Sequence, residues 1–206
     1  MILDRILAVA GLIVTSPILA ICAVAILFED GAPVIFSQSR IGRGGHPFNL
    51  RKLRSMRMVP VTSSITAAGD PRITRIGKWL RRYKLDELPQ LWNVAVGEMN
   101  LIGPRPEVSR FVDMEDPRWR QVLSVLPGIT DLATLMYRNE EELLASSPTP
   151  EAYYRSVVLP EKLHLNVLYL KHRSLGSDLK LLFLTIRYAF WPVGFKPENI
   201  RHSFLS

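Results

Sequence analysis

"LRRYKLDELPQLWNV", residues Leu80–Val94, joins two predicted helices through a pair of adjacent acids, Asp86 and Glu87. Before the acids, apolar side chains recur at helical spacing among arginines and lysines, which predicts an amphipathic basic helix. After them, the sequence predicts a second helix that opens at Asp86, runs to about Val96 and closes at Gly97. The position of two carboxylates between two helices calls for an explanation.

Two interpretations of the acids are open. In the first, Asp86 is a helix N-cap, Glu87 favours the positive end of the helix dipole, and Pro89 lies in the first turn, where its missing N–H is not needed. In the second, the acids have separate chemical roles, because neighbouring helical side chains point about 100° apart. One would act as a nucleophile and the other as a ligand for a hard cation such as Mg²⁺.

The N-terminal segment Ile6–Phe28 carries no charge and is long enough to cross a bilayer. A cleaved signal peptide, a spanning anchor and a re-entrant segment are the three possibilities. Pro17 removes one helical hydrogen bond and crowds the carbonyl of Ile13. The hydroxyls of Thr15 or Ser16 could satisfy that carbonyl in lipid. The sequence does not choose between a kinked spanning helix and a re-entrant turn at Ser16–Pro17.

The charge of the chain favours an anionic partner. The 206 residues carry a net charge of +7, so nucleic acid, an acidic membrane surface and phosphorylated small molecules all qualify. The single cysteine, Cys22, excludes an intrachain disulfide. Six basic residues follow the apolar segment within residues 40–57, whereas only Arg5 precedes it, offset by Asp4. The positive-inside bias therefore predicts that the body of the protein is cytoplasmic.

The remaining chain predicts an α+β fold that is mainly helical. A β-hairpin is expected over residues 32–56, with its turn at Arg43–His46, and a loop over Val61–Pro71. The tail from Glu161 to Phe190 is apolar at helical spacing and predicts helices. Between Leu179 and Trp191 we expect an amphipathic stretch that lies on the membrane, and burial of part of it in the core is the alternative. The expected division is a membrane helix over residues 1–30 and a cytosolic domain over residues 31–206. The histidines have no metal-binding spacing.

The segment "DPRITRIGKWLRRYKLDELPQLWNVAVGEMNLIGPRPE", Asp70–Glu107, resembles the core signature of the bacterial sugar transferases, the small monotopic phosphoglycosyltransferases of membrane glycoconjugate assembly. "FNLRKLRSM", "LPGIT" and "SDLKLLFLTI" also match, and "SP" at Ser16–Pro17 looks like the family's helix break. The resemblance covers nearly the whole chain. It implies a re-entrant N-terminal membrane helix and amphipathic interfacial helices around a cytosolic catalytic core, on the cytoplasmic face of the bacterial inner membrane.

The resemblance also implies a two-step reaction. Asp86 would attack the β-phosphate of a UDP-sugar, release UMP and form a covalent aspartyl intermediate, and undecaprenyl phosphate would then take the sugar phosphate. Glu87 would bind Mg²⁺, and Arg105 would hold a phosphate. Weaker candidates for phosphate or sugar contacts are Lys52, Arg81 and Arg138. Solvated or lipid-facing charge is the alternative for Lys52 and Arg81.

One departure from the family pattern concerns the run after "PGIT". Many members continue with a Gly-Trp-Ala-Gln type of run, whereas this chain has "DLATLMYRN", residues 131–139. This departure leaves the sugar open. The sequence also leaves open the glycan pathway and the oligomeric state, with a homodimer as one option. The resemblance implies membrane lipid, a UDP-sugar and undecaprenyl phosphate as partners, and no nucleic acid. The alternative class is a membrane-anchored binder of anionic lipid or nucleic acid without catalysis, which would not need Asp86 or Glu87.

Overall fold

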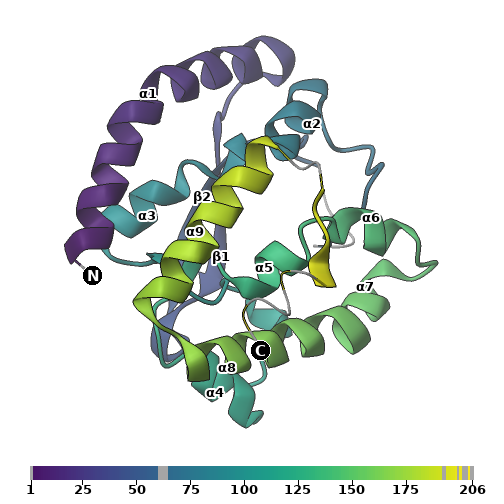
Figure 1. Ribbon diagram of the computed structural model, residues 1–206. Helices are drawn as coiled ribbons and strands as arrows, with labels where there is room; N and C mark the ends of the chain where they lie inside the picture. Colours follow the sequence, from purple (N-terminus) through teal and green to yellow (C-terminus); the bar gives the residue numbers. More distant parts are fainter. Residues whose placement is uncertain (1, 60–64, 192–193, 199, 201–203, 205–206) are drawn as a thin grey trace.

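The computed structural model describes residues 2–59, 65–191, 194–198, 200 and 204. Helices make up most of it and two small sheets complete it, which confirms the mainly helical α+β prediction (Figure 1). The larger elements are α1 (Ile2–Asp30), β1 (Ile35–Ile41), β2 (Pro47–Leu53), α2 (Arg75–Arg82), α3 (Gln90–Val96), β3 (Asn100–Ile102), α4 (Pro117–Val122), β4 (Gly128–Thr130), α5 (Leu132–Met136), α6 (Glu140–Ala145), α7 (Pro150–Tyr153), α8 (Leu159–His172) and α9 (Leu175–Phe190).

Helix α1 continues through Pro17 without losing its helical assignment. Figure 1 shows it curving over the outside of the molecule, so the predicted break takes the form of a bend within one helix. The Ser16 hydroxyl donates to the carbonyl of Ile13 at 2.8 Å, and the Thr15 hydroxyl donates to that of Gly11 at 2.7 Å. The predicted rescue of the carbonyl that faces the proline is therefore confirmed, and Ser16 provides it.

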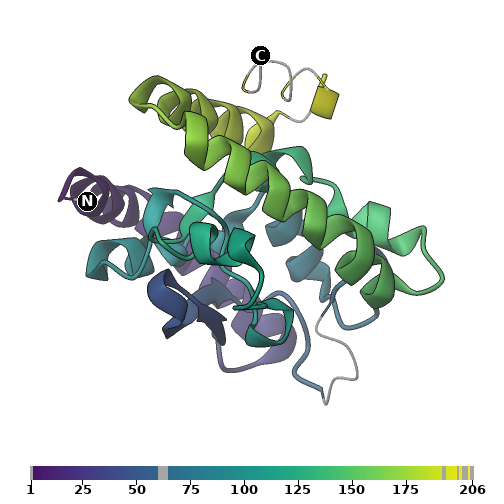
Figure 2. The ribbon, with the colours of Figure 1, turned by 90° about the horizontal axis from the view of Figure 1, so that it is seen from below.

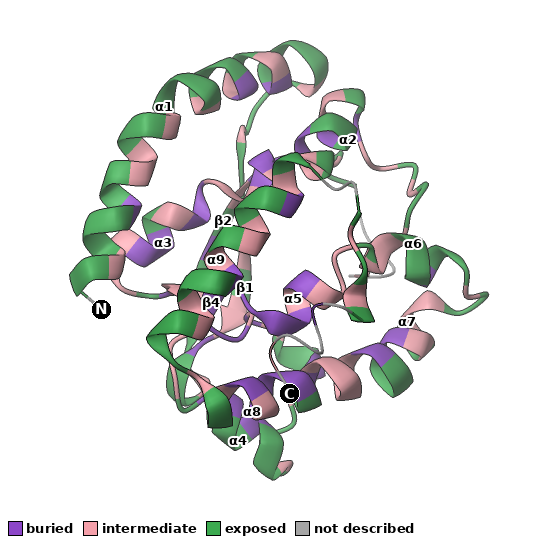
Figure 3. Ribbon diagram, in the orientation of Figure 1, coloured by how far each residue is buried: buried purple, intermediate pink, exposed green. Residues whose placement is uncertain are grey.

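Helix α1 is long and apolar enough to cross a membrane by length and composition. Most of its side chains are exposed, and Figure 3 shows the buried ones as isolated patches along the helix. Ala8 packs with Leu50 and Val94 near its N-terminal end. Cys22 and Ile26 pack in a second cluster nearer its C-terminal end. One narrow face therefore holds α1 on the body, and most of the other described side chains of α1 are apolar and exposed.

The predicted β-hairpin is confirmed. Strands β1 and β2 pair antiparallel from Ile35 opposite Leu53 to Ile41 opposite Pro47. Gly44 has a φ of 70° in the connecting turn, a conformation that favours glycine. The hairpin carries Lys52 on β2 toward the turn that contains the two acids.

The C-terminal end of α1 also caps the following helix. The Glu29 carboxylate accepts hydrogen bonds from the backbone N–H groups of Arg75, at 2.7 Å, and Ile76, at 2.8 Å. The Thr74 side chain accepts from the N–H of Gly77 at 2.9 Å as the N-cap of α2. These bonds satisfy N–H groups that have no partner inside α2, and they fix α2 relative to α1.

The connection from α2 to α3 differs from the sequence prediction. Lys84 adopts a left-handed conformation with a φ of 56°, a 3₁₀ turn follows at Leu85–Glu87, and α3 begins only at Gln90. Asp86 lies inside a helical turn and makes no capping bond, so the N-cap interpretation is wrong. The reversal at Lys84 turns the Asp86 side chain into the interior. The predicted end of this helix at Gly97, with a φ of 89°, is confirmed.

The second sheet and the core around it come after the turn of the two acids in the chain. Strands β3 and β4 pair in parallel, with Ile102 opposite Thr130, and a core of Leu132, Leu181 and Tyr188 packs around them. The predicted helical tail is two helices, because the chain leaves the helical conformation between α8 and α9, where Ser174 caps α9. Figure 2 shows α8 and α9 along one side of the molecule, with the hairpin on the opposite side.

Candidate active site

Asp86 is a buried carboxylate with an unpaired oxygen. The residue is 4% exposed, and its Oδ1 is buried without a hydrogen-bond partner. Burial raises the pKa of this carboxyl, the charge of Glu87 raises it further, and Lys52 and Arg81 oppose the shift. An ionised Asp86 is therefore poorly solvated, which is the condition of a carboxylate that can act as a nucleophile.

Glu87, the next residue, has the opposite environment. Its Oε1 accepts from Arg105 Nη2 at 2.6 Å and lies 3.3 Å from Lys52 Nζ. Burial alone would raise the pKa of Glu87, but Arg105 and Lys52 outweigh burial and hold it well below its usual range. Glu87 is therefore ionised and held by two cations, whereas Oδ1 of its neighbour Asp86 has no hydrogen-bond partner among the described residues. Two acids with opposed environments fit two different chemical roles.

Arg105 is held by β4 and by the residue that caps α5. Its Nη1 donates to the carbonyl of Ile129 at 2.8 Å, and its backbone N–H donates to Asp131 Oδ2 at 2.8 Å. Asp131 is fully buried and also caps α5 through the N–H of Thr134. The sequence alone predicted no role for Asp131. An acid immediately before a short helix is a local N-cap signal that could have drawn attention to it.

The other two predicted cations have separate positions. Arg81 forms an ion pair with Glu141 of α6 and donates to Ser55 Oγ at 3.3 Å, and its charge acts on Asp86. Arg138 is half-buried, and burial lowers its pKa. Within the described ranges, no hydrogen bond or ion pair joins Arg138 to Asp86 or Glu87. The structure thus brings Lys52 and Arg105 to the carboxylate of Glu87. It places Arg81 where its charge acts on Asp86, and it leaves Arg138 outside this group.

A second buried acid lies at the end of the same Pro-rich turn. The Glu107 carboxylate accepts from the Tyr154 hydroxyl and lies 3.5 Å from Arg40 Nη1, which also donates to the Pro106 carbonyl at 3.2 Å. Burial raises the pKa of Tyr154, and the charge of Glu107 raises it further. The hydroxyl therefore stays protonated as a donor. Glu107, Arg40 and Tyr154, here called the Glu107 cluster, form a network that the sequence did not predict.

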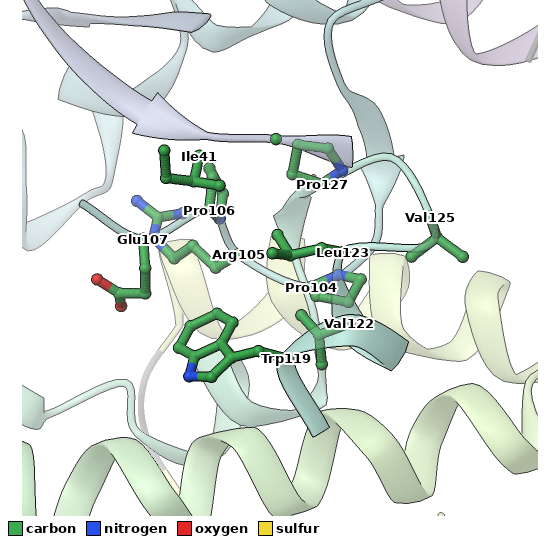
Figure 4. Close-up of a pocket in the computed structure, with 11 residues that line it drawn as sticks. Ile41, Pro104, Arg105, Pro106, Glu107, Trp119, Val122, Leu123, Val125 and Pro127 are labelled. Carbon is green, nitrogen blue, oxygen red and sulfur yellow. The ribbon is translucent and has the colours of Figure 1, made fainter. Parts of the chain in front are cut away.

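A pocket lies against the Pro-rich turn. Figure 4 shows Pro104, Arg105 and Glu107 along one part of its wall and Trp119 and Val122 along another. Neither Asp86 nor Glu87 lines this pocket. We therefore assign it to the support of the turn and do not place the reacting group in it.

The donor set fits a cation that arrives with its own oxygen ligands. The parts of the chain that the structure describes contain no group of three or more His, Cys, Asp or Glu side chains suited to a metal. Three histidines, His46, His164 and His172, are exposed, and His202 lies outside the described residues. Mg²⁺ commonly uses one or two protein carboxylates together with substrate phosphates and water. Glu87 beside Asp86 is compatible with that mode of binding.

Comparison with known proteins gives a consistent result. A family model described as "Bacterial sugar transferase" matches residues 1–192. A UDP-glucose:undecaprenyl-phosphate glucose-1-phosphate transferase of Escherichia coli K12 is 33% identical over 197 residues, which cover 91% of this chain and 39% of that protein. The galactosyl transferase CpsE of Streptococcus agalactiae is 34% identical over 202 residues, with 92% of this chain and 41% of that protein covered.

A third relative has a different sugar in its name. The UDP-N-acetylgalactosamine-undecaprenyl-phosphate N-acetylgalactosaminephosphotransferase of Aeromonas hydrophila is 35% identical over 190 residues, which cover 90% of this chain and 42% of that protein. The chain thus spans about two fifths of the length of these three relatives.

Proposed function

Because this chain belongs to the bacterial sugar transferase family, we propose that it moves a sugar-1-phosphate from a UDP-sugar to undecaprenyl phosphate, which yields a polyprenyl diphosphosugar and UMP. The observation that carries the proposal is the unpaired, buried Asp86 carboxylate beside the ion-paired Glu87. A membrane-anchored binder without catalysis would have no use for an acid kept in this costly environment.

The transfer proceeds in two displacements at phosphorus. In the first, an Asp86 carboxylate oxygen forms a bond to the β-phosphorus of the donor while the bond to the bridging oxygen breaks, and UMP leaves with that electron pair. In the second, a phosphate oxygen of undecaprenyl phosphate attacks the same phosphorus, and the Asp86 carboxylate leaves unchanged. Each step forms one phosphorus–oxygen bond and breaks another, so no further reactant is needed.

The cations beside Asp86 suit an anionic donor. Arg105 has its guanidinium fixed by Glu87 and by the carbonyl of Ile129, so it can meet a phosphate without reorganising. Lys52 adds a second positive charge at the same carboxylate. Mg²⁺, held by Glu87 and the donor phosphates, would offset negative charge on the diphosphate. Arg81 is a further candidate for a phosphate once its ion pair with Glu141 opens.

The apolar surface suits a membrane substrate. Helix α9 exposes a stripe of side chains three or four residues apart, and α1 exposes apolar side chains along most of its length. The members of the α9 stripe are Leu175, Leu179, Phe183, Ile186 and Phe190. An amphipathic helix with such a stripe lies in the bilayer interface. These apolar surfaces support the part of the proposal that puts the protein on the cytoplasmic leaflet of the inner membrane, where the phosphate of undecaprenyl phosphate would be presented.

The path of α1 in the membrane has its own test. The bend at Pro17 and the positive charge that follows α1 support a re-entrant helix whose two ends leave on the cytoplasmic side. Single cysteines at positions 2 and 40, in a Cys22→Ser background, should label from the same side of sealed vesicles. Labelling from opposite sides would show a spanning helix.

The experiment that tests the reaction looks for the covalent intermediate. Protein in nanodiscs is mixed with UDP-glucose or UDP-N-acetylgalactosamine and Mg²⁺ without acceptor, quenched in acid and weighed by mass spectrometry. We expect one added phosphosugar on the peptide that contains Asp86, one UMP released per adduct, and neither in Asp86→Asn. Comparing donors also identifies the sugar, because the relatives are named for different ones.

Two outcomes would contradict parts of this proposal. Release of UDP instead of UMP would indicate an ordinary one-step glycosyltransferase. An unmodified protein together with sequential kinetics would mean that undecaprenyl phosphate attacks the donor directly, and Asp86 would then lose the role of nucleophile.

A further inference from the structure

Gln90, the first residue of α3, has a side chain whose position is not explained by the reaction described above. It is 0% exposed, and both polar atoms of its amide, Nε2 and Oε1, are buried without a hydrogen-bond partner. Leaving a buried polar group unpaired lowers the stability of a fold. A leucine would fill a similar space without that cost, so the stability of the fold does not account for a glutamine here.

Asn93, one turn further along α3, shows what a structural amide looks like in this helix. It is also 0% exposed, but its Nδ2 donates to the Asn49 carbonyl at 2.8 Å and to Glu98 Oε2 at 2.6 Å. Its Oδ1 accepts from the backbone N–H of Arg51 at 3.2 Å. Asn93 therefore joins α3 to β2, whereas Gln90, under the same burial, joins nothing within the described residues.

The unpaired amide follows the unpaired carboxylate after about one turn of a continuous helical segment. The backbone stays helical between the 3₁₀ turn and α3, with Leu88 at φ −54° and ψ −36° and Pro89 at φ −61° and ψ −15°. Asp86 and Gln90 are four residues apart in this segment, which is about one helical turn. Asp86 Oδ1 can only accept when ionised, and Gln90 Nε2 can only donate. The two buried groups are complementary.

Three of the nearby cations are engaged with other carboxylates. Arg105 and Lys52 contact Glu87, and Arg81 pairs with Glu141. A cation bonded directly to Asp86 would form a charge-assisted hydrogen bond, which is about twice as strong as a neutral one and would withdraw more electron density from the carboxylate. A neutral amide would orient the carboxylate with less of this loss. Orientation of the nucleophile by an uncharged donor would preserve its reactivity.

We propose that Gln90 is a positioning residue for Asp86: as the UDP-sugar binds, Gln90 Nε2 donates to Asp86 Oδ1 and holds Oδ2 toward the β-phosphorus. The inference rests on the proposed function. Catalytic hydrogen bonds are often long without substrate and shorten in the loaded enzyme, which accounts for two complementary groups that are unpaired here. The bond orients an oxygen that reacts elsewhere, so Gln90 itself exchanges no atoms with the substrate.

The test compares three variants in full-length protein with the donor that gives the adduct in the wild type. Gln90→Leu removes both polar atoms. Gln90→Glu keeps the shape and an acceptor but loses the amide donor. Asn93→Leu is the matched control for loss of a buried amide in the same helix. For each, rapid acid quench gives the single-turnover rate of adduct formation and its dependence on donor concentration, and thermal unfolding gives the stability.

We expect Gln90→Leu and Gln90→Glu to slow adduct formation at saturating donor by about 10- to 100-fold, with the half-saturating donor concentration unchanged. Gln90→Leu should unfold at the same temperature as the wild type or higher, and Asn93→Leu should unfold at a lower one. Adduct formation at the wild-type rate in either Gln90 variant would overturn the inference and leave the proposed reaction standing. A wild type without adduct would overturn both.

Discussion

The segment that carries Asp86 and Gln90, here called the Asp86–Gln90 face, is linked to the Glu107 cluster through Glu87 and Arg105 of the Pro-rich turn. These two polar regions differ in how completely their groups are paired. In the Glu107 cluster, each carboxylate oxygen has a partner, Tyr154 on one and Arg40 on the other. On the Asp86–Gln90 face, one carboxylate oxygen and both amide atoms have none. Saturated polar networks stabilise a fold, whereas unpaired buried groups are retained where chemistry uses them. Under the proposed reaction, the difference marks the Glu107 cluster as scaffold and Asp86 as the reacting group.

The largest expected effect comes from Glu87, which links the two regions through Arg105. Glu87→Gln removes the charge that Lys52 and Arg105 contact, and with it the proposed Mg²⁺ ligand. UMP release should fall roughly 10²- to 10³-fold, and raised Mg²⁺ should restore part of it. The control is Glu151→Gln, which breaks an exposed ion pair with Arg110 and should leave UMP release unchanged. Equal losses in both variants would contradict a special role for Glu87.

Tyr154→Phe tests the saturated region. It removes the hydroxyl that donates to Glu107 and leaves a buried carboxylate short of one partner. The free energy of unfolding should drop by about 1–3 kcal/mol, measured by urea titration, while the UMP release rate per folded molecule stays close to that of the wild type. Tyr153→Phe is the control, since Tyr153 precedes the cluster in the chain and is not part of it. A loss of rate without a loss of stability would place the Glu107 cluster in the reacting centre.

The third prediction concerns opposite pH responses of the two neighbouring acids. Folding raises the pKa of Asp86, so this carboxyl contributes stability below its unfolded pKa of about 3.9, and the contribution is lost as pH rises through the folded value. Folding lowers the pKa of Glu87, so its contribution is present above an unfolded pKa of about 4.3 and is lost as pH falls.

Asp86→Asn should therefore raise the Tm at neutral pH, by about 2–4 °C for each kcal/mol gained, and Glu87→Gln should lower it. Both differences should shrink as the pH is lowered and the wild-type carboxyls take up protons. Thermal unfolding of the two variants and the wild type, with a chelator present, measures this directly. A shift of the same sign in both variants would remove the contrast between the acids.

The smallest expected effect lies in α1. Ser16→Ala leaves the Ile13 carbonyl without the donor that replaces the missing N–H of Pro17, and should destabilise the helix by about 0.5–1.5 kcal/mol. Thr15→Ala is the matched control, because the Gly11 carbonyl that Thr15 contacts is also the helical acceptor of the Thr15 N–H. Amide exchange in nanodiscs should show faster exchange near the bend in Ser16→Ala only. Equal exchange in the two variants would show that the Ser16 bond adds nothing.

Local sequence patterns determined much of the architecture. A long uncharged run predicted α1, and paired apolar runs around glycines predicted the hairpin β1–β2. Helical spacing among basic residues predicted α2, and Gly97 marked the end of α3. The proline in α1 even predicted which carbonyl would need a hydroxyl. Each of these features depends on residues close together in the chain, so the sequence specified them without knowledge of the fold.

The resemblance in the sequence also pointed to Asp86, Glu87 and Arg105, but not to how they differ. Only the tertiary structure brought Lys52 and Arg105, 35 and 18 residues from Glu87, onto the same carboxylate oxygen. Only the left-handed turn at Lys84 sent Asp86 inward and made the N-cap interpretation wrong.

The same holds for the groups that no pattern marked. Glu107 and Tyr154 meet across 47 residues, and Asp131 reaches the backbone of Arg105 across 26. Gln90 is unremarkable in the sequence and becomes informative only because it is buried without a partner. Burial and pairing depend on which distant segments pack together, and they set the protonation and orientation of each acid. The sequence by itself therefore determined the helices, the hairpin and the family of this chain, and the tertiary structure decided which of its carboxylates is unpaired.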